Sequence, residues 1–385
     1  MQTVIKNADI YVGDGVVQNG YIRFDKKVLG VGPMDEYTPQ EADENVVDGS
    51  DKIVVPGFID VHTHGGYGID SMDDDSVKVN EMICQEAKNE GITSIFPNTV
   101  TQSASNISQA MKVLKVVAQE TPVMQGIHLE GPFISAEYKG AQPEQYITNP
   151  DAGLLKEWNE LSGGLIKVIT YAPEQSGAAD VESYCQAHQI VLSVGHSSAK
   201  QAQLEQSKAP HITHLYNAQR GMHHREPGVT GETLLEKKFY TEIIADGYHV
   251  APDMIDLAYR LKGADKIELI TDSLRAKGMP EGVSELGGQK VIVKDHQACL
   301  ENGHLAGSVL EYDLAFKNII NFTSCSISDA VKMTSYNQAQ EFNLESKGEL
   351  KAGKDADINI LDRELNLEAT YSCGRLLNSS DPSTS

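Results

Sequence analysis

The stretch Ile53-Val-Val-Pro-Gly-Phe-Ile-Asp-Val-His-Thr-His64 is an apolar run that ends in two histidines, and similar runs recur along the chain. They alternate with longer amphipathic segments, which is typical of a parallel sheet whose strands are connected by helices. The predicted strands are Ile53–Val61, Ile92–Pro97, Val123–Leu129, Leu165–Thr170, Ile190–Val194, His211–Thr213, Thr241–Ala245 and Ile267–Thr271. The predicted helices include Val77–Glu90, Ser105–Gln119, Ala178–His188 and Pro252–Leu261. Eight such strands predict an α/β fold of the (β/α)8 TIM-barrel type.

A doubly wound parallel sheet has less support, because no GxGxxG motif follows the first strand and the chain has no Walker motif. Short β-prone pieces near the start of the chain resemble the alternating segment Asp357–Ile360 near its end. Both ends are therefore predicted to form one small β-module around a larger insert. The pieces near the start are Thr3–Ile5, Asp9–Val12, Gly20–Phe24 and Lys27–Val31.

The formal net charge of the 385 residues is −23. This balance argues against a surface for nucleic acid or an anionic membrane, although one arginine and a few backbone N–H groups can hold a single phosphate. Five scattered cysteines without a CxxC pair predict reduced thiols. The start of the chain lacks a signal-peptide pattern, and no apolar stretch approaches the roughly 20 residues that span a bilayer. We therefore expect a soluble, cytoplasmic protein.

Nearly every predicted strand ends in an imidazole or a carboxylate, and barrel active sites lie at these strand ends. The residues are His62, His64, His128, Glu130, His196, His214, Asp246, His249 and Asp272. His62 and His64 are two residues apart, so their side chains point the same way on a strand. One histidine at a strand end is most often solvated or hydrogen-bonded, but so many together favour a shared role. Histidine with carboxylate ligands suits zinc, iron and similar divalent metals.

Several motifs make the chain resemble the amidohydrolase superfamily and, within it, the N-acetylglucosamine-6-phosphate deacetylase family. They are Pro56-Gly-Phe-Ile-Asp-Val-His-Thr-His-Gly65, His128-Leu-Glu-Gly-Pro-Phe133, Lys139-Gly-Ala141, Gly195-His-Ser197, Thr213-His-Leu-Tyr-Asn-Ala218, Arg225-Glu-Pro-Gly228, Ala245-Asp-Gly-Tyr-His-Val250, Thr271-Asp272 and Leu305-Ala-Gly-Ser308. The resemblance runs from about residue 50 to about 360. It implies a catalytic barrel over residues 55–345 and a small β-sandwich domain from residues 1–54 and 346–385, with a disordered tail at 378–385.

The resemblance implies a divalent metal cation, zinc or iron, with one or two per subunit. Glu130, His196 and His214 match the family's metal ligands. The HxH pair, His62 and His64, matches a second metal site that only some members have. Many other amidohydrolases bridge two metals with a carbamylated lysine. Glu130 stands at that strand end here, which argues against dihydropyrimidinase-like and dihydroorotase-like proteins.

Amide hydrolysis needs a residue that takes a proton from water and delivers it to the leaving amine. Asp272, at the end of the eighth run, is the candidate for this general acid/base. The alternative is a helix N-cap, a position at which aspartate is favoured.

The resemblance also implies substrate-binding residues: Ala141, Asn217, Ala218, Arg225, His249, Leu305, Ala306, Gly307 and Ser308. The backbone N–H groups of Asn217 and Ala218 could face a phosphate. Arg225 could bind the phosphate with its guanidinium or instead pair with Glu226. His249 could contact the sugar or be an ordinary loop histidine.

The small residues Ala306, Gly307 and Ser308 precede the amphipathic segment Val309–Asn321, so they are expected to allow close approach of the substrate to a helix N-terminus. Gln142 replaces the family's usual histidine after Lys-Gly-Ala and cannot carry a proton, so it receives no catalytic role. His223 and His224 are expected to be solvated.

The function implied is hydrolysis of N-acetylglucosamine 6-phosphate to glucosamine 6-phosphate and acetate, in amino-sugar catabolism and cell-wall sugar recycling. The partner is a small phosphorylated amino sugar, and the family implies a homodimer in which Arg225 acts in its own or the neighbouring subunit. The first alternative is an amidohydrolase that acts on another N-acyl sugar or a cyclic amide. The second is a non-catalytic scaffold, which would have no need of Asp272.

Overall fold

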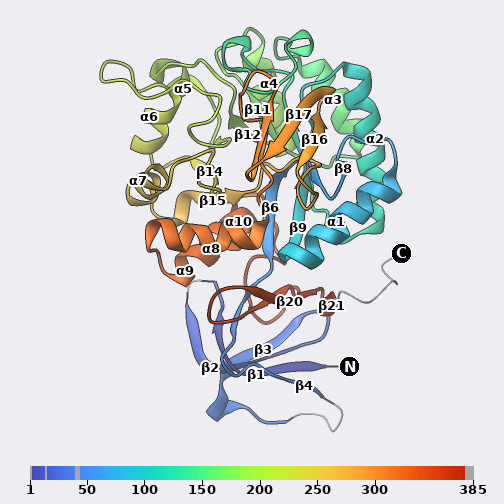
Figure 1. Ribbon diagram of the computed structural model, residues 1–385, viewed down its shortest axis with the longest axis vertical. Helices are drawn as coiled ribbons and strands as arrows, with labels where there is room; N and C mark the ends of the chain where they lie inside the picture. Colours follow the sequence, from blue (N-terminus) through green and yellow to red (C-terminus); the bar gives the residue numbers. More distant parts are fainter. Residues whose placement is uncertain (1, 14, 40–43, 378–385) are drawn as a thin grey trace.

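The computed structural model describes residues 2–13, 15–39 and 44–377, and Figure 1 shows two parts stacked along the long axis. Strands from both ends of the chain lie together at the bottom of the view, and strands that alternate with helices lie above them. The predicted disordered tail, residues 378–385, lies outside the described residues.

The lower part is one eight-stranded sheet with the order β21-β20-β19-β5-β1-β2-β3, in which β4 also pairs with β1. Its strands are β1 (Thr3–Tyr11), β2 (Val16–Phe24), β3 (Val28–Pro33), β4 (Asn45–Asp48), β5 (Ile53–Pro56), β19 (Ile358–Leu361), β20 (Leu367–Ser372) and β21 (Arg375–Leu377). The strand β5 from the start of the chain pairs antiparallel with β19 from its end. The two chain ends therefore share one sheet, and its buried core includes Ile5, Phe24, Val54 and Ile358.

The two predicted pieces Thr3–Ile5 and Asp9–Val12 belong to one strand, β1. Its pairing with β2 shifts register on both sides of Ala8, and Asn7 between the pieces has a φ of 64°. A bulge therefore lets the strand continue through a polar residue that the sequence pattern indicated as a break.

The upper part contains parallel strands. Six of them form one sheet with the order β10-β11-β12-β13-β14-β15, and β6 pairs with β9. Their bounds are β6 (Phe58–Thr63), β9 (Ile92–Pro97), β10 (Ile127–Glu130), β11 (Ile166–Tyr171), β12 (Val191–Val194), β13 (His211–Ile212), β14 (Tyr240–Ile244) and β15 (Ile267–Ile270). A parallel bridge joins Asn98, just after β9, to His128 of β10. The backbone N–H of Asp272, just after β15, donates to the carbonyl of His62 in β6 at 2.8 Å.

The prediction of a single first strand, Ile53–Val61, is wrong. Ile53–Pro56 belongs to the chain-end sheet and Phe58–Thr63 to the parallel strands, with Gly57 between them. The N–H of Gly57 donates to the carbonyl of Asp357 at 2.9 Å, and a Cβ atom at this position would clash with the side chain of Thr93. The chain thus passes from one sheet to the other at a point where only glycine fits.

The prediction for the third strand, Val123–Leu129, is too long, since β10 begins at Ile127. Before Gly126, the carbonyl of Val123 and the N–H of Gln125 bond to the backbone of Ile95. Gly126, at which a Cβ atom would clash with Lys167, separates these contacts from β10.

Helices connect most of the parallel strands. They are α1 (Ser76–Glu90), α2 (Ala104–Glu120), α3 (Ala152–Ser162), α4 (Ala178–His188), α5 (Gln201–Gln206), α6 (Gly228–Leu235), α7 (Pro252–Lys262), α8 (Tyr312–Thr323), α9 (Ile327–Val331) and α10 (Asn337–Glu341). The side chain of Asp75 accepts from the first N–H groups of α1, and Gly91, with a φ of 75°, follows its last residue. The four predicted helices correspond to α1, α2, α4 and α7. None of the described helices is long and apolar enough to cross a membrane.

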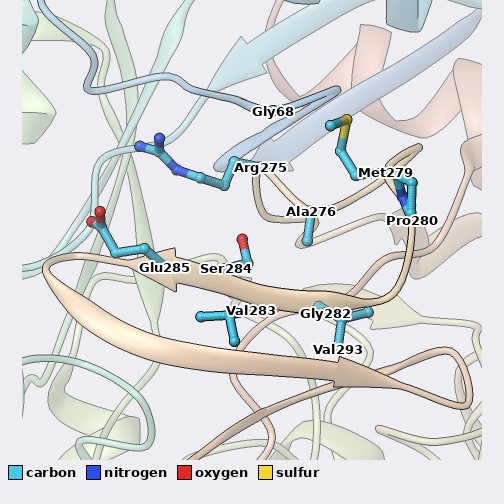
Figure 2. A pocket seen from close by; sticks show the side chains of 10 residues that line it. All are labelled: Gly68, Arg275, Ala276, Met279, Pro280, Gly282, Val283, Ser284, Glu285 and Val293. Atoms are coloured by element: carbon cyan, nitrogen blue, oxygen red, sulfur yellow. The ribbon is translucent and has the colours of Figure 1, made fainter.

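The segment after β15 forms a small antiparallel sheet that was not predicted. Its strands are β16 (Gly282–Leu286), β17 (Gln289–Lys294) and β18 (Gln297–Leu300). A cavity of about 400 Å³ lies between this sheet and the preceding turns. In Figure 2, Arg275 and Glu285 lie at one end of the cavity, and Met279 and Pro280 lie at the other. The hairpin of β7 (Gly65–Gly66) and β8 (Ile69–Asp70) contributes Gly68 to its lining.

Buried ion pairs hold the turns after β15 against α1. Nζ of Lys277 lies 2.7 Å from Glu86 and 3.0 Å from Glu90, and all three side chains are fully buried. Arg275 pairs with Asp73 at 2.8 Å near the start of the same helix. All five cysteines lie in the described residues and are free thiols, as predicted.

We expect Lys277→Met to lower the free energy of unfolding by about 3–5 kcal/mol, because it leaves the carboxylates of Glu86 and Glu90 buried without a compensating charge. Lys290→Met is the control, since Lys290 pairs with Glu301 on the surface, where ion pairs contribute little. Equilibrium unfolding in urea measures both variants. Similar losses in the two would show that the buried pairs do not hold this segment.

Candidate metal centre

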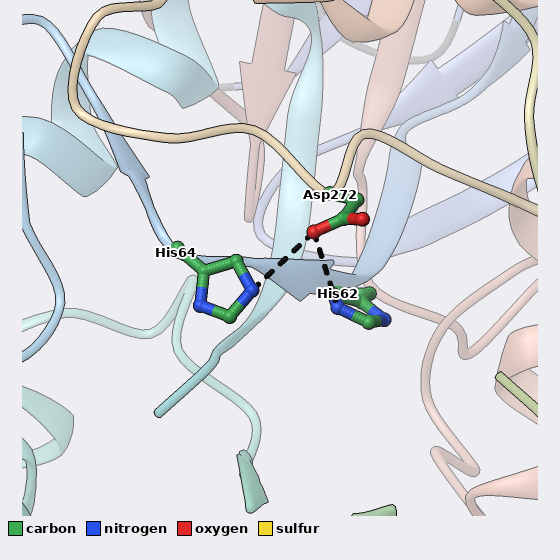
Figure 3. A group of neighbouring side chains, drawn as sticks. All are labelled: His62, His64 and Asp272. Atoms are coloured by element: carbon green, nitrogen blue, oxygen red, sulfur yellow. Dashed lines mark ion pairs between the residues drawn. The ribbon is translucent and has the colours of Figure 1, made fainter. Parts of the chain in front are cut away.

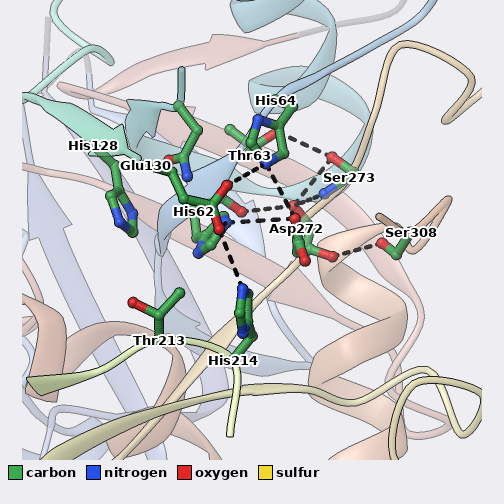
Figure 4. Close-up of polar contacts among 12 residues, drawn as sticks. His62, Thr63, His64, His128, Glu130, Thr213, His214, Asp272, Ser273 and Ser308 are labelled. Atoms are coloured by element: carbon green, nitrogen blue, oxygen red, sulfur yellow. Dashed lines mark hydrogen bonds and ion pairs between the residues drawn. The ribbon is translucent and has the colours of Figure 1, made fainter. Parts of the chain in front are cut away.

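Three side chains from neighbouring strand ends meet in a first cluster: Glu130, His196 and His214. Glu130 ends β10, His196 follows β12, and His214 follows β13. Oε1 of Glu130 lies 3.1 Å from Nε2 of each histidine, and the two Nε2 atoms lie 3.1 Å apart. Figure 4 shows the Glu130 carboxylate turned toward His214. The structure thus brings together the three residues predicted for the tighter metal site.

The hydrogen bonds around the first cluster fit a cation. Nδ1 of His196 lies 3.0 Å from the carbonyl of Tyr138, which can only accept, so Nδ1 carries a hydrogen. In the neutral ring, Nε2 of His196 then presents a lone pair to Nε2 of His214. Two facing nitrogen atoms need a proton or a cation between them, and nitrogen with carboxylate oxygen is a ligand set of zinc and similar metals.

His62, His64 and Asp272 form a second cluster beside the first. Oδ1 of Asp272 lies 3.4 Å from Nε2 of His62 and 3.3 Å from Nε2 of His64, and Figure 3 shows both rings next to this carboxylate. Nε2 of His64 is also 3.1 Å from Oε2 of Glu130. His62 near the end of β6 and His64 just after it therefore face the same carboxylate, and Glu130 borders both clusters.

The electrostatics of the two clusters are tightly linked. Burial lowers the pKa of His64, but Asp272 and Glu130 outweigh it and raise that pKa to about 9. Burial would raise the pKa of the Asp272 carboxyl, yet His62 and His64 hold it well below its usual value. At Glu130, burial would likewise raise the pKa of the carboxyl. The nearby histidines, His62 first among them, hold this pKa well below normal. Both carboxylates are anions at neutral pH, so the centre attracts either protons or a cation.

The backbone at these strand ends is left-handed at three site residues. The φ angle is 47° at His196, 29° at His214 and 48° at Asp272. Such conformations cost a non-glycine residue about 1–3 kcal/mol each, and they occur where the surrounding structure fixes a functional side chain. No helix begins at Asp272, because turns and the bridge between Ser273 and Ser308 follow it. The N-cap alternative for Asp272 is therefore wrong.

Glu242 of β14 supports both clusters from behind. Its Oε2 accepts from Nδ1 of His62 at 2.9 Å and from the backbone N–H of His214 at 3.1 Å. Glu242 was not among the predicted site residues. Its sequence position could have indicated it, because Glu242, like Glu268, is a charged residue within an apolar run. A charged side chain in a buried strand must have a buried partner.

His128 and Gln142 have supporting positions. His128 donates from Nδ1 to the carbonyl of Val61 and accepts at Nε2 from Thr170. Burial, followed by the nearby His62, lowers the pKa of His128 to about 3. Gln142 donates to Oε2 of Glu130 at 3.0 Å and accepts from the N–H of Thr101. The residue without a predicted role therefore orients the carboxylate that both clusters share.

His249 is fixed by Asp246 at the end of β14. Nδ1 of His249 lies 2.6 Å from Oδ2 of Asp246, and its backbone N–H donates to Oδ1 of the same carboxylate. The pair leaves Nε2 of His249 free of these contacts. Such a carboxylate–histidine pair fixes the ring orientation, which an ordinary loop histidine does not need.

The first cluster has small residues beside it. A Cβ atom on Gly140 would lie 3.2 Å from Ala218 and 3.4 Å from Cε1 of His196, which places Ala218 next to this histidine. The carbonyl of the predicted site residue Ala141 accepts from Gln289. The predicted role of the Asn217 N–H needs correction, since it donates to the carbonyl of His214 at 2.9 Å and closes a turn there.

Arg225 lies on an exposed loop together with His223 and His224. Its guanidinium contacts Nε2 of His224 at 2.9 Å. The alternative partner, Glu226, instead accepts from the backbone N–H groups of Gln201 and Gly228. The surface pair with Glu226 is therefore not formed.

Residues Leu305–Ser308 lie beside the second cluster but not at a helix N-terminus, since α8 begins only at Tyr312. Ser308 forms the bridge with Ser273, and its N–H donates to the carbonyl of Asp272 at 2.8 Å. Gly307 has a φ of 69°, and a Cβ atom there would lie 2.9 Å from that carbonyl. The Asp272 backbone therefore requires a residue without a side chain at position 307, and the approach of substrate to Gly307 stays a prediction.

Comparisons with known proteins identify the family of the chain. The sequence model of the amidohydrolase family matches residues 53–378. The chain belongs to the amidohydrolase family.

Relatives cover nearly the whole chain. N-acetylglucosamine-6-phosphate deacetylase of Bacillus subtilis (strain 168) is 39% identical over 97% of this chain and 96% of the relative. N-acetylgalactosamine-6-phosphate deacetylase of Escherichia coli O157:H7 is 33% identical over 84% of this chain and 88% of the relative. A variant of N-acetyl-D-glucosamine-6-phosphate deacetylase from Mycobacterium smegmatis, solved with N-acetyl-D-glucosamine-6-phosphate, has a TM-score of 0.92 at 27% identity and covers 98% of this chain and 100% of that one.

We expect His196→Ala to abolish cation binding at the first cluster, because it removes one of three facing ligand atoms. The double variant His62→Ala/His64→Ala should lose only the second equivalent of a protein that otherwise binds two. Elemental analysis after dialysis against a zinc buffer measures both. Full metal content in His196→Ala would remove this residue from the ligand set.

Proposed function

We propose that this protein hydrolyses N-acetylglucosamine 6-phosphate to glucosamine 6-phosphate and acetate. The observation that carries the proposal is the meeting of the two His/carboxylate clusters at Glu130, in a chain that matches deacetylases of this substrate along its whole length. A scaffold protein would have no use for an ionised, strained Asp272 between two histidines.

Glu130, His196 and His214 would hold the tighter divalent cation, zinc or iron, and His62, His64 and Asp272 would hold a second one. When bound, such a cation lowers the pKa of a water molecule and stabilises the negative charge that develops on the amide oxygen. Glu242 and Gln142 keep His62 and Glu130 in position, as their hydrogen bonds indicate.

Asp272 is the proposed general acid/base. Its carboxylate is ionised before the reaction, so it can accept a proton from the attacking water. It then delivers this proton to the amine nitrogen, which leaves only when protonated. The hydrogen bonds from its own N–H to His62 and from the Ser308 N–H to its carbonyl hold the strand end in place during both transfers.

The sugar phosphate is proposed to bind across the open side of the clusters. His249, oriented by Asp246, offers Nε2 to the sugar. Arg225 supplies the positive charge for the phosphate, in its own subunit or in the neighbouring subunit of a homodimer. The remaining proposed contacts come from Ala141, Asn217 and Ala218 and from the segment Leu305–Ser308, with the Asn217 contact made by its side chain.

We further infer that β6, β9 and β10–β15 close into a (β/α)8 barrel spanning residues 55–345. The bridge from Asn98 to His128 and the bond from Asp272 to His62 support this closure. The sheet of the two chain ends, residues 1–54 and 346–385, would be the β-sandwich domain. The cytoplasmic location stays a prediction.

Acetate release from four sugars tests the function: N-acetylglucosamine and N-acetylgalactosamine, each with and without the 6-phosphate. We expect kcat/KM to be highest for N-acetylglucosamine 6-phosphate. A preference for the galactosamine epimer would favour the second candidate, which the Escherichia coli relative represents. No acetate from any of the four would contradict the proposal.

We expect Asp272→Asn to lower kcat by at least roughly two orders of magnitude with little change in KM, because general acid–base assistance contributes about 10²–10⁴ in rate. Asparagine keeps the shape but cannot transfer the proton. Metal content at the first cluster should stay intact, which separates lost chemistry from lost cation. A kcat close to that of the wild type would pass the role to another residue, with His249 the next candidate.

We expect Arg225→Ala to raise KM for the 6-phosphate sugar much more than for the unphosphorylated sugar. A chain of net charge −23 needs a local cation to hold a phosphate dianion. Lys200→Ala, on a neighbouring exposed loop, is the control for a general loss of positive charge. Equal effects of Arg225→Ala on both sugars would exclude the assignment.

A further inference from the structure

A chain of buried hydrogen bonds leads from the second cluster toward the opposite end of the parallel strands. It begins at Nδ1 of His62, which faces Oε2 of Glu242 at 2.9 Å. Oε1 of Glu242 faces Nε2 of His211, the first residue of β13, at 3.1 Å. Nδ1 of His211 then faces Oε2 of Glu341, the last residue of α10, at 2.8 Å. Glu242, His211 and Glu341 are not among the residues proposed to bind the cation or the substrate.

His211 occupies an unusual position, because both of its ring nitrogens face carboxylates. A ring that donates from both nitrogens is an imidazolium, and its side chain is fully buried. Burial lowers the pKa of His211, but Glu341 and Glu242 outweigh burial and raise it well above the usual value. The ring therefore bonds Glu242 and Glu341 without competition from water.

Two further titratable groups, Glu268 and His128, face this chain, and the hydrogen bonds of His211 to Glu242 and Glu341 are formed beside them. Glu268 of β15 lies next to Glu341, and burial and the charge of Glu341 raise its pKa well above normal, so it is neutral. His128 approaches Oε1 of Glu242 only to 4.0 Å, and its Nδ1 donates to the carbonyl of Val61 instead. The side-chain partner that fixes Oε1 of Glu242 is thus His211.

The orientation of Glu242 decides which nitrogen of His62 is available to a cation. When Glu242 accepts from Nδ1–H, the lone pair of the neutral ring lies on Nε2, which faces Asp272 and Glu130 at 3.4 and 3.6 Å. If Glu242 turns away, no acceptor holds the hydrogen on Nδ1. A neutral His62 ring with its hydrogen on Nε2 cannot bind a metal through that atom.

We propose that His211 and Glu341 are positioning residues of the second metal cluster: together they fix the Glu242 carboxylate, which keeps Nε2 of His62 ready for a cation. The proposal rests on the assignment of His62 as a metal ligand in the proposed function. It predicts that residues without contact to substrate or cation set the affinity of one of the two sites.

The test compares two substitutions of His211 in the full-length protein. His211→Phe keeps a buried ring but loses both hydrogen bonds, whereas His211→Gln can still donate to Glu242 through its amide. We expect His211→Phe to weaken the second zinc equivalent by about 10–100-fold, the usual effect of losing such an outer partner, and His211→Gln to weaken it less. The affinity for the first zinc equivalent should stay unchanged in both variants. Glu341→Gln should also weaken the affinity for the second equivalent.

Competition with a chromophoric chelator gives both zinc affinities, and the thermal midpoint of the metal-free protein reports folding. Glu182→Gln is the matched control, since Glu182 is a buried helix carboxylate that accepts a hydrogen bond from Tyr171 and takes no part in the hydrogen bonds of His211, Glu242 and Glu341. If His211 only filled space, His211→Phe would keep a higher affinity for the second zinc ion than His211→Gln. This is the reverse of the expected order. If a His211 variant fails to fold, the affinity of Glu341→Gln for the second zinc ion still tests the proposal.

Three results would overturn the proposal: a second equivalent unchanged in His211→Phe and Glu341→Gln, a wild type that binds only one zinc ion, or loss of a third equivalent. The last would mean that His211, Glu268 and Glu341, whose ligand atoms lie within 4.8 Å of one another, themselves hold a metal. Zinc binding requires no substrate, so two equivalents without acetate release would contradict the proposed function and leave this inference standing.

Discussion

The rest of the site depends on the contacts that the buried carboxylate of Glu130 makes with the surrounding histidines. One oxygen faces His196 and His214, and the other faces His64 and the amide of Gln142. A buried carboxylate is expensive unless charges and hydrogen bonds surround it, and here four elements supply them. The two clusters are therefore one electrostatic unit whose parts cannot move independently. This unit is built on strand ends, where the backbone is rigid enough to hold left-handed residues.

Much of this arrangement could be predicted because it follows from local patterns. Apolar runs that end in His or Asp indicate buried strands with functional ends, and β9 has the predicted bounds of Ile92–Pro97. The alternation of His62 and His64 with Thr63 placed both rings on one face. These inferences need only the periodicity of a strand and the rule that barrel sites lie at its carboxyl end.

Other features could not be predicted, because they depend on contacts between distant segments. Gly57 divides an apparently continuous run, since Thr93 leaves no space for a side chain. The Asn217 N–H is used by a turn whose φ angles the sequence does not display. Glu242 lies inside an apolar run, and its partners His62 and His211 come from other strands. Polar residues within apolar runs show that a buried partner exists, but they do not identify it.

The pairing of β5 with β19 has a consequence for synthesis of the chain. β5 continues through Gly57 into β6, the strand that carries His62 and leads directly to His64. Its antiparallel partner β19, however, lies more than half the chain away in sequence. During translation the edge of β5 that pairs with β19 therefore stays unpaired until Ile358–Leu361 has been synthesised. Contacts so distant in sequence form late and slowly. The chain-end sheet, on which the base of β6 rests through β5 and Gly57, is completed only when β19 pairs with β5.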